Sequence, residues 1–324
     1  MNTDKKLKIT LPKGSLWKDI KRLFEEAGYR LSGSDRGYRP SINDPEIELK
    51  LLRPQEIPNY LTAEDGFDLG ISGLDWVKET GADVEQVLDL KVGGVRIVFC
   101  VPDDWDDIKS LDDIIKKFHE ENKILKFSTE YINLSIDRIM NAPSYKEAYG
   151  DKIPRVITPW KSWGTNEKVK IFLSFGATEA KPPEEVDAII DNTQTGSTIR
   201  ANKLTIVETL DKSTAILLAN KNSLEDEWKR EKIEDIKILL KGVRDARKKI
   251  HLFMNVLEEN LQALIDVLPA LKKPTVSKLA GANSDGWLAV NTIINKDQLI
   301  DLIPKLRKLA QGIVIHEPRQ VIET

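Results

Sequence analysis

The sequence predicts an α/β protein of two lobes, followed by a smaller α+β domain. Strands and helices alternate over roughly the first two thirds of the chain, as they do in a largely parallel sheet covered by helices. Strand-like segments at residues 204–209 and 214–219 can cross back to complete the first lobe, so that two connections join the lobes. The C-terminal part has the order strand, helix, strand, strand, helix, strand, which is typical of a ferredoxin-like unit. A cleft between two lobes is a natural ligand site.

We assign residues 1–102 and 205–228 to the first lobe. Apolar residues at helical spacing over residues 16–27 predict a helix that Ser15 caps and Gly28 ends. The expected strands are residues 7–11, 47–52, 68–72 and, as one long strand or two short ones, 90–102.

The second lobe is assigned to residues 103–204 and the C-terminal domain to residues 229–324. Residues 141–168 show no clear period, so we expect a long excursion there. A helical connector at residues 224–249 should lead into the C-terminal domain, which could regulate, oligomerise or stabilise. In the second lobe the expected helices are 110–120, 134–140 and one beginning near Gly196, and the expected strands are 124–128, 169–174 and 188–191. In the C-terminal domain the expected strands are 250–257, 275–279, 287–294 and 313–317, and the expected helices are 259–268 and 297–309.

Composition excludes several classes of protein. The 49 basic and 52 acidic residues give a net charge of −3, which argues against a general nucleic-acid binder. The N-terminus has no signal-peptide core, and no apolar stretch approaches the roughly 20 residues that span a bilayer, so we expect a cytoplasmic protein without a membrane partner. Cys100 should be a buried strand residue, and the three histidines lack metal-ligand spacing.

The segment with the clearest chemistry is residues 186–204. An apolar strand ends in Asp191, and Thr195-Gly196-Ser197-Thr198 then opens a helix. Free amides at a helix start, flanked by hydroxyl groups, can bind a phosphate, and Asp191 can accept hydrogen bonds from sugar hydroxyls. The set suits a ribose 5-phosphate, although an ordinary capped helix gives the same pattern.

Three further segments place charged residues where strands end. Lys13 follows the first strand, Arg53 follows the second and precedes Pro54, which is placed to start a helix, and Asp75 lies after the glycine-framed strand that ends at Ser72. Lysine and arginine there can bind phosphate. A solvated lysine, a surface salt bridge and helix capping by Ser72 or Asp75 are the alternatives.

These motifs, in this order, resemble the catalytic region of ATP phosphoribosyltransferases. The matching segments are Leu-Pro-Lys-Gly-Ser-Leu at 11–16, Leu-Arg-Pro-Gln-Glu-Ile at 52–57, Asp-Leu-Gly-Ile-Ser-Gly-Leu-Asp at 68–75, Ser-Thr-Glu-Tyr-Ile-Asn-Leu at 128–134, Gly-Ala-Thr-Glu at 176–179 and Asp-Ala-Ile-Ile-Asp-Asn-Thr-Gln-Thr-Gly-Ser-Thr at 187–198. The resemblance covers nearly the whole chain and is to the long form of the family. It implies a two-lobed catalytic part like that of type II periplasmic binding proteins and an ACT-like C-terminal domain.

The resemblance also implies an activity. ATP and phosphoribosyl pyrophosphate (PRPP) would react in the first step of histidine biosynthesis, with Mg²⁺ bound mainly through substrate oxygens, feedback inhibition by histidine, and a dimer or hexamer. The implied catalytic residues are Lys13, Arg53, Asp75 and Asp191; the implied PRPP-binding residues are Glu179, Asp191, Thr193, Thr195, Gly196, Ser197 and Thr198; the implied regulatory residues are Asn255, Thr275 and Ser277.

The chain departs from the family in three places. Residues 141–168 are longer than the usual connection, and Pro182-Pro183-Glu184-Glu185 replaces a shorter link. Asn255 stands where some relatives have an aspartate that binds the histidine amino group; an amide oxygen can still accept one hydrogen bond. Two other functions compete with the enzyme: a non-enzymatic small-molecule-binding protein of the same fold, and a regulatory paralogue without turnover. The loop from Asp191 to Thr198 favours the enzyme over a solute binder.

Overall fold

The computed structural model describes residues 5–33, 37–269, 273–280 and 286–322. The chain forms two compact units. The first contains residues up to Trp17 and Ile47–Asp226, and the second contains Lys18–Glu46 and the chain from Glu227 onward. This division differs from our domain assignment, in which residues 18–46 were part of the first lobe, because these residues belong to the second unit.

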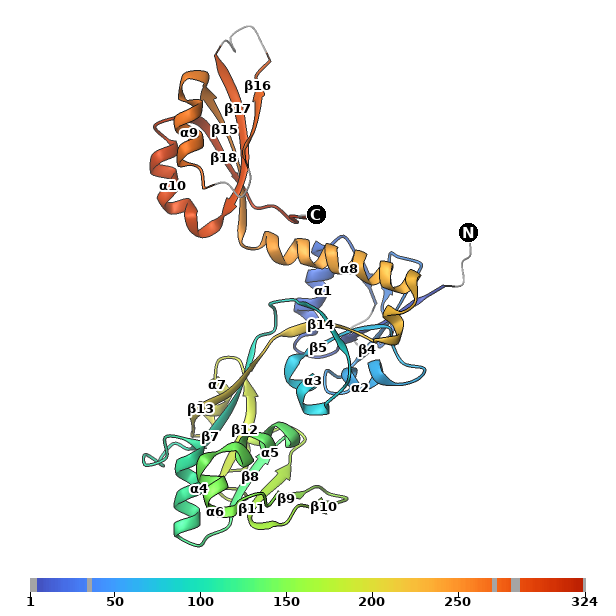
Figure 1. The fold of residues 1–324 in the computed structure, drawn as a ribbon, viewed down its shortest axis with the longest axis vertical. Helices are drawn as coiled ribbons and strands as arrows, with labels where there is room; N and C mark the ends of the chain where they lie inside the picture. The colour runs from blue at the N-terminus through green and yellow to red at the C-terminus, as the bar shows by residue number, and fades with distance from the viewer. Residues whose placement is uncertain (1–4, 34–36, 270–272, 281–285, 323–324) are drawn as a thin grey trace. The chain divides into compact units, whose positions relative to one another are not determined.

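The first lobe of the first unit is a five-stranded sheet with the order β4-β1-β5-β14-β6. β1, β4 and β5 are parallel, whereas β14, the strand that returns from the other lobe, is antiparallel to both of its neighbours (Figure 1). Apolar side chains on the first strands are buried, as strands covered by helices require. The strands are β1 (Leu7–Pro12), β4 (Ile47–Leu52), β5 (Leu69–Gly73), β6 (Glu85–Asp89) and β14 (Ala215–Ala219), and the helices are α2 (Ile57–Thr62) and α3 (Leu74–Thr80).

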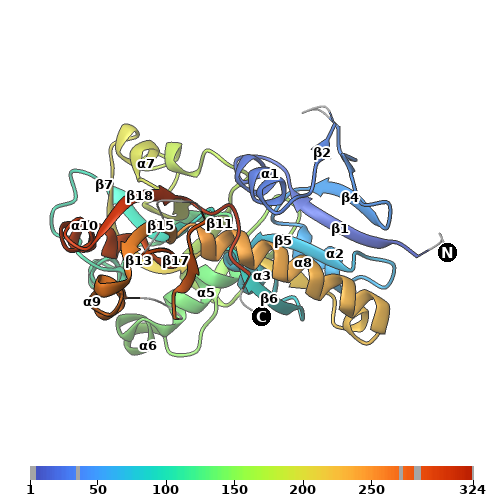
Figure 2. The ribbon, with the colours of Figure 1, turned by 90° about the horizontal axis from the view of Figure 1, so that it is seen from above.

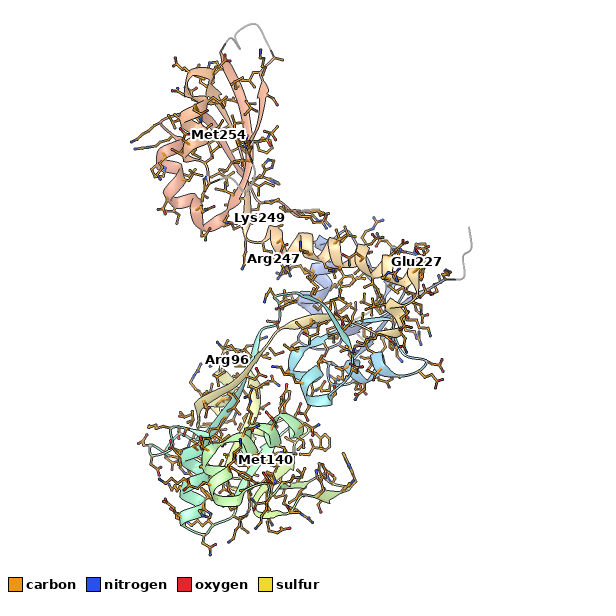
Figure 3. All side chains as sticks on the ribbon, in the orientation of Figure 1. Arg96, Met140, Glu227, Arg247, Lys249 and Met254 are labelled. Atoms are coloured by element: carbon orange, nitrogen blue, oxygen red, sulfur yellow. The ribbon has the colours of Figure 1, made fainter. Side chains whose placement is uncertain are left out.

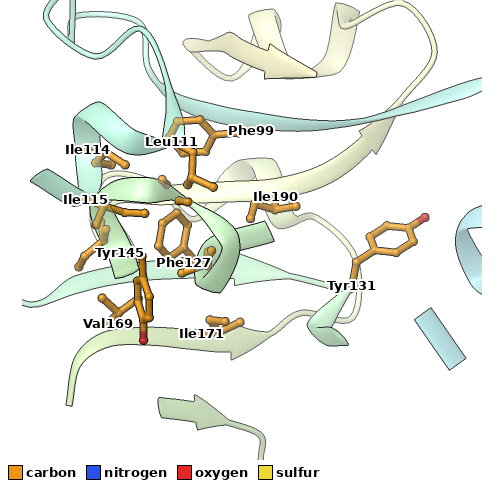
Figure 4. Packing of buried hydrophobic residues seen from close by; sticks show 14 of the residues in the cluster. Phe99, Leu111, Ile114, Ile115, Phe127, Tyr131, Tyr145, Val169, Ile171 and Ile190 are labelled. Atoms are coloured by element: carbon orange, nitrogen blue, oxygen red, sulfur yellow. The ribbon is translucent and has the colours of Figure 1, made fainter. Parts of the chain in front are cut away.

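The second lobe is a seven-stranded sheet with the order β10-β9-β11-β8-β12-β7-β13. Side chains from α4, α5 and α6 pack on this sheet around Phe127 and Ile171, as Figure 4 shows. The strands are β7 (Val95–Pro102), β8 (Leu125–Thr129), β9 (Pro154–Ile157), β10 (Ser162–Trp163), β11 (Asn166–Leu173), β12 (Ala188–Thr193) and β13 (Leu204–Ser213); the helices are α4 (Leu111–Glu120), α5 (Ile132–Asn141), α6 (Pro143–Tyr149) and α7 (Ser197–Ala201).

The two lobes share one strand order. The first lobe has the order β4-β1-β5-β14-β6. Apart from β9 and β10, which are added at one edge, the second lobe has the matching order β11-β8-β12-β7-β13. β14 is the strand that arrives from the other lobe in the first sheet, and β7 is that strand in the second. The predicted two-lobed α/β fold is therefore confirmed.

Two strands lie in a different lobe from the one we expected. β7 pairs with β12 and β13 in the second sheet, so residues 95–102 belong to the second lobe and not to the first. β13, which pairs with β7 as far as Ser213, also belongs to the second lobe. Of the segments expected to cross back, only β14 joins the first sheet. An apolar run shows that a strand is buried, but its pairing partners lie far away in the sequence and decide which sheet it joins.

The excursion predicted over residues 141–168 is regular structure, although its sequence shows no clear period. It contains α6, and β9 and β10 extend the second sheet beyond β11. The buried Tyr145 fixes this segment, since its hydroxyl donates to the Lys152 carbonyl at 2.5 Å and accepts from Asn166 Nδ2 at 2.8 Å. These elements are too short for a hydrophobic period to be recognised.

The C-terminal domain is the predicted ferredoxin-like unit. Its antiparallel sheet has the order β16-β17-β15-β18, and α9 and α10 cover one face (Figures 1 and 2). Figure 3 shows Met254 within this domain, and Arg247 and Lys249 where α8 meets β15. The elements are β15 (Lys249–Leu257), α9 (Leu261–Val267), β16 (Thr275–Lys278), β17 (Trp287–Asn295), α10 (Leu299–Leu306) and β18 (Ala310–His316), with short 3₁₀ turns at Glu258–Asn260 and Lys296–Gln298.

The second unit also contains the predicted connector, which is the 20-residue helix α8 (Glu227–Ala246). Helix α1 (Trp17–Glu26) ends as predicted, with Gly28 at a φ of +103° where a residue with a side chain would be strained. The remaining elements are the short strands β2 (Leu31–Ser32) and β3 (Ser41–Ile42). Among the residues that the structure describes, no helix has the length and apolarity needed to cross a membrane.

Candidate active site

Two basic residues meet where the first two parallel strands end. The register of β1 and β4 pairs Pro12 with Leu52, so Lys13 and Arg53 leave the sheet side by side. The Lys13 amide donates to the Leu52 carbonyl at 2.7 Å. Gly14 has a φ of +108°, and a Cβ there would lie 3.8 Å from Arg53 Nη1. The structure therefore brings the two predicted cations together.

A pocket of about 550 Å³ opens beside Arg53. Residues of both lobes of the first unit line it. It lies at the ends of parallel strands, which is where ligands bind in open α/β sheets. The lining residues are Arg53, Gln55 and Trp76 from the first lobe and Glu130, Leu173, Ser174 and Phe175 from the second. The helix after Arg53 begins at Ile57, and Pro58, not Pro54, lies in its first turn.

Asp75 lies in a different environment from the one that we expected for a catalytic residue. Its side chain is only 4% exposed. One carboxylate oxygen accepts from the Tyr131 hydroxyl at 2.8 Å and the other from the Ser213 hydroxyl at 2.5 Å. Gly73, without a side-chain bond, occupies the cap of α3, so neither Ser72 nor Asp75 caps this helix. Asp75 therefore connects α3 to Ser213 of β13 and to Tyr131, both of the second lobe.

Tyr131 extends this network in the second lobe. Its ring stacks on Trp76 at 4.4 Å between centroids, and its hydroxyl accepts from Asn192 Nδ2 at 3.0 Å. Figure 4 shows Tyr131 at the edge of the core with its hydroxyl pointing away from Phe127. Burial and the nearby Asp75 carboxylate raise the pKa of the Tyr131 hydroxyl well above its usual range, so Tyr131 remains a donor to Asp75.

A second carboxylate of α3 holds the start of helix α5. Glu79 accepts hydrogen bonds from the backbone amides of Asn133 at 3.0 Å and Leu134 at 2.9 Å, which are free at a helix N-terminus. The Asn133 side chain donates to the Glu79 carbonyl at 2.8 Å. Burial raises the pKa of Glu79, while these amides lower it. Asp75 and Glu79 are therefore two connections between α3 and the second lobe.

Asp191 lies in an acidic environment within β12, which continues to Thr193 and not only to Asp191 as predicted. Burial, first, and the nearby carboxylates of Glu130 and Glu179 raise the pKa of Asp191 to about 6, although the Asn192 amide donates to it at 2.7 Å. Asp191 is therefore ionised at neutral pH at an energetic cost. A carboxylate kept in such a place is a candidate for a functional role.

The loop after Asp191 exposes three hydroxyl groups. Thr195, Ser197 and Thr198 are exposed, and the Thr195 and Ser197 hydroxyls lie 3.0 Å apart. Gly196 begins helix α7 with a φ of +76° and without a side-chain cap, and its amide donates to Thr193 Oγ1 at 2.9 Å. The N-cap alternative, in which a Thr or Ser side chain caps the helix, is not what the structure shows. This positive φ favours glycine, and a Cβ at Gly196 would lie 2.9 Å from Arg200 Nη1 and Ile206 Cδ1, so these side-chain ends would have to shift.

Comparison with known proteins identifies the family. Residues 53–242 match the family model of ATP phosphoribosyltransferase, and residues 246–317 match that of the HisG C-terminal domain. The ATP phosphoribosyltransferase of Pelotomaculum thermopropionicum is 39% identical over 97% of this chain and 98% of its own length. That of Desulforudis audaxviator is 40% identical over 98% of this chain and 99% of its own.

The chain belongs to the ATP phosphoribosyltransferase family. A solved structure, the ATP phosphoribosyl transferase (HisG:HisZ) complex from Thermotoga maritima, shares the fold with a TM-score of 0.54 and 21% identity, covering 74% of this chain and 98% of that one. The family-model matches and the relatives at 39–40% identity confirm the predicted resemblance and identify the chain as a transferase of histidine biosynthesis. A solute-binding protein of the same fold is not favoured.

Six residues of the pocket carried no predicted role: Gln55, Trp76, Glu130, Leu173, Ser174 and Phe175. Glu130 directly follows β8, and Asp191 directly follows Ile190, which pairs with the last residue of β8, Thr129. The rule that already selected Lys13 and Arg53, a polar residue at a strand end, would have found it. Phe175 had no such signal, because an aromatic residue after a strand is usually part of the core.

Glu179 lies on the 3₁₀ turn Thr178–Ala180, beside a lysine that the sequence analysis also missed. The Lys181 ammonium donates to the hydroxyls of Ser174 at 2.7 Å and Ser128 at 3.3 Å. These contacts fix the turn that carries Glu179 relative to the ends of β8 and β11.

The residues expected to regulate lie on the C-terminal sheet of the family fold. Asn255 pairs with Ala289 and Ala289 pairs with Ser277, so Asn255 and Ser277 face the same side of the sheet. Thr275 lies two residues from Ser277 on the same side. The other side carries the buried core under α9 and α10, so the three residues share the open face.

Proposed function

We propose that this chain joins ATP to PRPP with the residues described above. The adenine N1 nitrogen, which carries no proton, forms a bond to the anomeric carbon of PRPP as the bond from that carbon to pyrophosphate breaks. The observation that carries the proposal is the pocket that places Arg53 opposite Glu130, which lies beside Asp191 and the exposed hydroxyl loop. No amino-acid nucleophile is required.

Each part of PRPP has a proposed partner. The loop of Thr193, Thr195, Gly196, Ser197 and Thr198 anchors the 5-phosphate, and Asp191, with Glu179 near it, accepts from the ribose hydroxyls. Lys13 and Arg53 offset the negative charge of pyrophosphate and of the nucleotide. Holding both reactants makes the displacement effectively intramolecular, which lowers its barrier.

Mg²⁺ fits this site as a substrate-bound ion. Carboxylate oxygens suit it, and Asp191 would hold one of its positions. We propose that pyrophosphate oxygens and water would supply most of its ligands. When bound, it stabilises the charge on the leaving group.

The C-terminal sheet is the proposed site of histidine inhibition, with Asn255, Thr275 and Ser277 as candidate contacts. Its open face also carries exposed apolar residues, Phe253 and Val314, which pair across β15 and β18. We propose that a second copy of the chain covers such a face in a homo-oligomer. A cytoplasmic location follows from the use of ATP and PRPP.

The activity is tested by mixing the purified protein with ATP, PRPP and Mg²⁺ and following pyrophosphate release. We expect release that depends on all three and that free histidine reduces. Absence of release from folded protein would contradict the proposed function, whereas release that histidine leaves unchanged would contradict only the regulatory assignment.

Replacing Thr198 by valine should raise the KM for PRPP about tenfold, because one phosphate-binding hydroxyl is lost from the loop. The shape of the side chain is kept, so the KM for ATP should stay near the wild-type value. Steady-state kinetics with each substrate varied in turn measure both constants. An unchanged KM for PRPP would remove the hydroxyl from the phosphate site.

A further inference from the structure

Two aromatic rings stand exposed at the edge of the pocket. Trp160 is 72% exposed and Phe175 71% exposed, yet their ring centroids lie only 5.9 Å apart. Phe175 also lines the pocket that contains Arg53. Large apolar rings held together in water mark a binding surface. This pair, Trp160 and Phe175, is called the aromatic platform below.

Hydrogen bonds fix the two turns that carry these rings. Trp160 lies in the turn of the β9–β10 hairpin, where Thr158 and Lys161 close the turn with backbone and side-chain hydrogen bonds of 2.8–3.0 Å. Phe175 follows Ser174, whose amide donates to the Thr129 carbonyl at 2.8 Å and whose hydroxyl accepts from Lys181. Both contacts fix the turn from which Phe175 projects. A platform that is ordered before binding loses little entropy when a ligand stacks on it.

We propose that the aromatic platform stacks against the adenine ring of ATP, which deepens and rests on the proposed function. A purine offers a flat π-face, and stacking on aromatic side chains is a general mode of base binding. In the same pocket Arg53 is placed for phosphate oxygens, and Glu130 can accept from the adenine amino group, which lies next to the reacting N1. The hairpin that carries Trp160 belongs to the long excursion over residues 141–168.

The test separates the base from the phosphates. Calorimetric titrations without PRPP compare ATP with inorganic tripolyphosphate, which has no base, in the presence of Mg²⁺. For Trp160→Ala we expect ATP affinity to fall about tenfold, within the range of one stacking contact, while tripolyphosphate binds as to wild type. Trp160→Phe should restore most of the affinity. In turnover, Trp160→Ala should raise the KM for ATP and leave the KM for PRPP unchanged.

Trp163→Ala is the matched control, because Trp163 lies on the same hairpin and Lys161 Nζ already lies 5.9 Å from its ring centroid. It should bind ATP as wild type does. Equal losses for ATP and tripolyphosphate, or wild-type ATP affinity in Trp160→Ala, would overturn the proposal. Wild-type affinity with a change in subunit number by light scattering would show that a second copy covers the platform instead.

Failure of this inference differs from failure of the proposed function. Binding is measured without turnover. If the wild-type chain binds ATP through the aromatic platform but releases no pyrophosphate, the proposed reaction is contradicted and the proposed adenine contact is not. If the wild-type chain releases pyrophosphate and Trp160→Ala keeps the wild-type KM for ATP, only the proposed adenine contact is contradicted.

Discussion

Replacing Asp191 by asparagine is expected to cut kcat/KM about a hundredfold, because an amide lacks the charge that strengthens hydrogen bonds to ribose hydroxyls. The same change should stabilise the folded protein at neutral pH. Burial and the carboxylates of Glu130 and Glu179 raise the pKa of Asp191 to about 6, so the folded state binds the proton more tightly than the unfolded chain does. At pH 7.5 the ionised group therefore destabilises the fold, and a neutral amide removes that cost.

The pH dependence follows from the direction in which the pKa of Asp191 moves. A raised folded-state pKa gives stability that is complete below the ordinary pKa of 3.8 and is lost as the pH rises through about 6. A pKa raised this far corresponds to about 3 kcal/mol of folding free energy, and partial exposure to solvent reduces the expected gain to about 1 kcal/mol. The melting temperature of Asp191→Asn should thus exceed that of wild type by more at pH 7.5 than at pH 5.

Activity should respond in the opposite direction to acid. If the carboxylate form of Asp191 is needed, wild-type kcat/KM should fall as the pH drops through about 6, and the residual activity of Asp191→Asn should lack that step. Asp191→Ala is the companion variant, which should also lose most activity while remaining folded. Near-wild-type turnover in either variant would remove Asp191 from the mechanism.

Replacing Asp75 by alanine is expected to reduce the free energy of unfolding by about 3 kcal/mol, because two buried hydroxyls lose their acceptor. Tyr131 and Ser213 donate to the two carboxylate oxygens, and both contacts are buried. The variant should therefore unfold at lower urea concentration, and its activity loss should follow the loss of folded protein. Urea titration followed by tryptophan fluorescence, with turnover measured on the same samples, checks both.

Tyr131→Phe is the matched control for Asp75→Ala. It keeps the ring that stacks on Trp76 and removes one donor, so a smaller loss of about 1 kcal/mol is expected. The double variant should lose less than the sum of the single losses, since the two groups form one contact. Wild-type stability of Asp75→Ala with abolished turnover would instead mean that Asp75 acts directly in the chemistry.

Much of the site was predictable because it depends on short segments. Lys13 and Arg53 each follow an apolar strand, Asp191 follows the apolar part of β12, and parallel pairing brings such positions together. Gly196 was predictable for a similar reason, since a strand-to-helix turn that needs a positive φ favours glycine. The role of Asp75 was not, because its partners lie 56 and 138 residues away. A helix-start motif does not indicate whether its carboxylate faces solvent or a distant strand.

The sequence by itself determined much of the order of strands and helices, the ferredoxin-like C-terminal unit and the glycine turn that opens α7, because each depends on apolar spacing and turn residues a few positions apart. Only the tertiary structure decided that β7 and β13 belong to the second sheet, that residues 141–168 extend that sheet, and that Trp160 stands against Phe175. Strand pairing and ring contacts join residues far apart in the chain. They are selected by the packing of the whole fold, which local hydrophobic patterns do not encode.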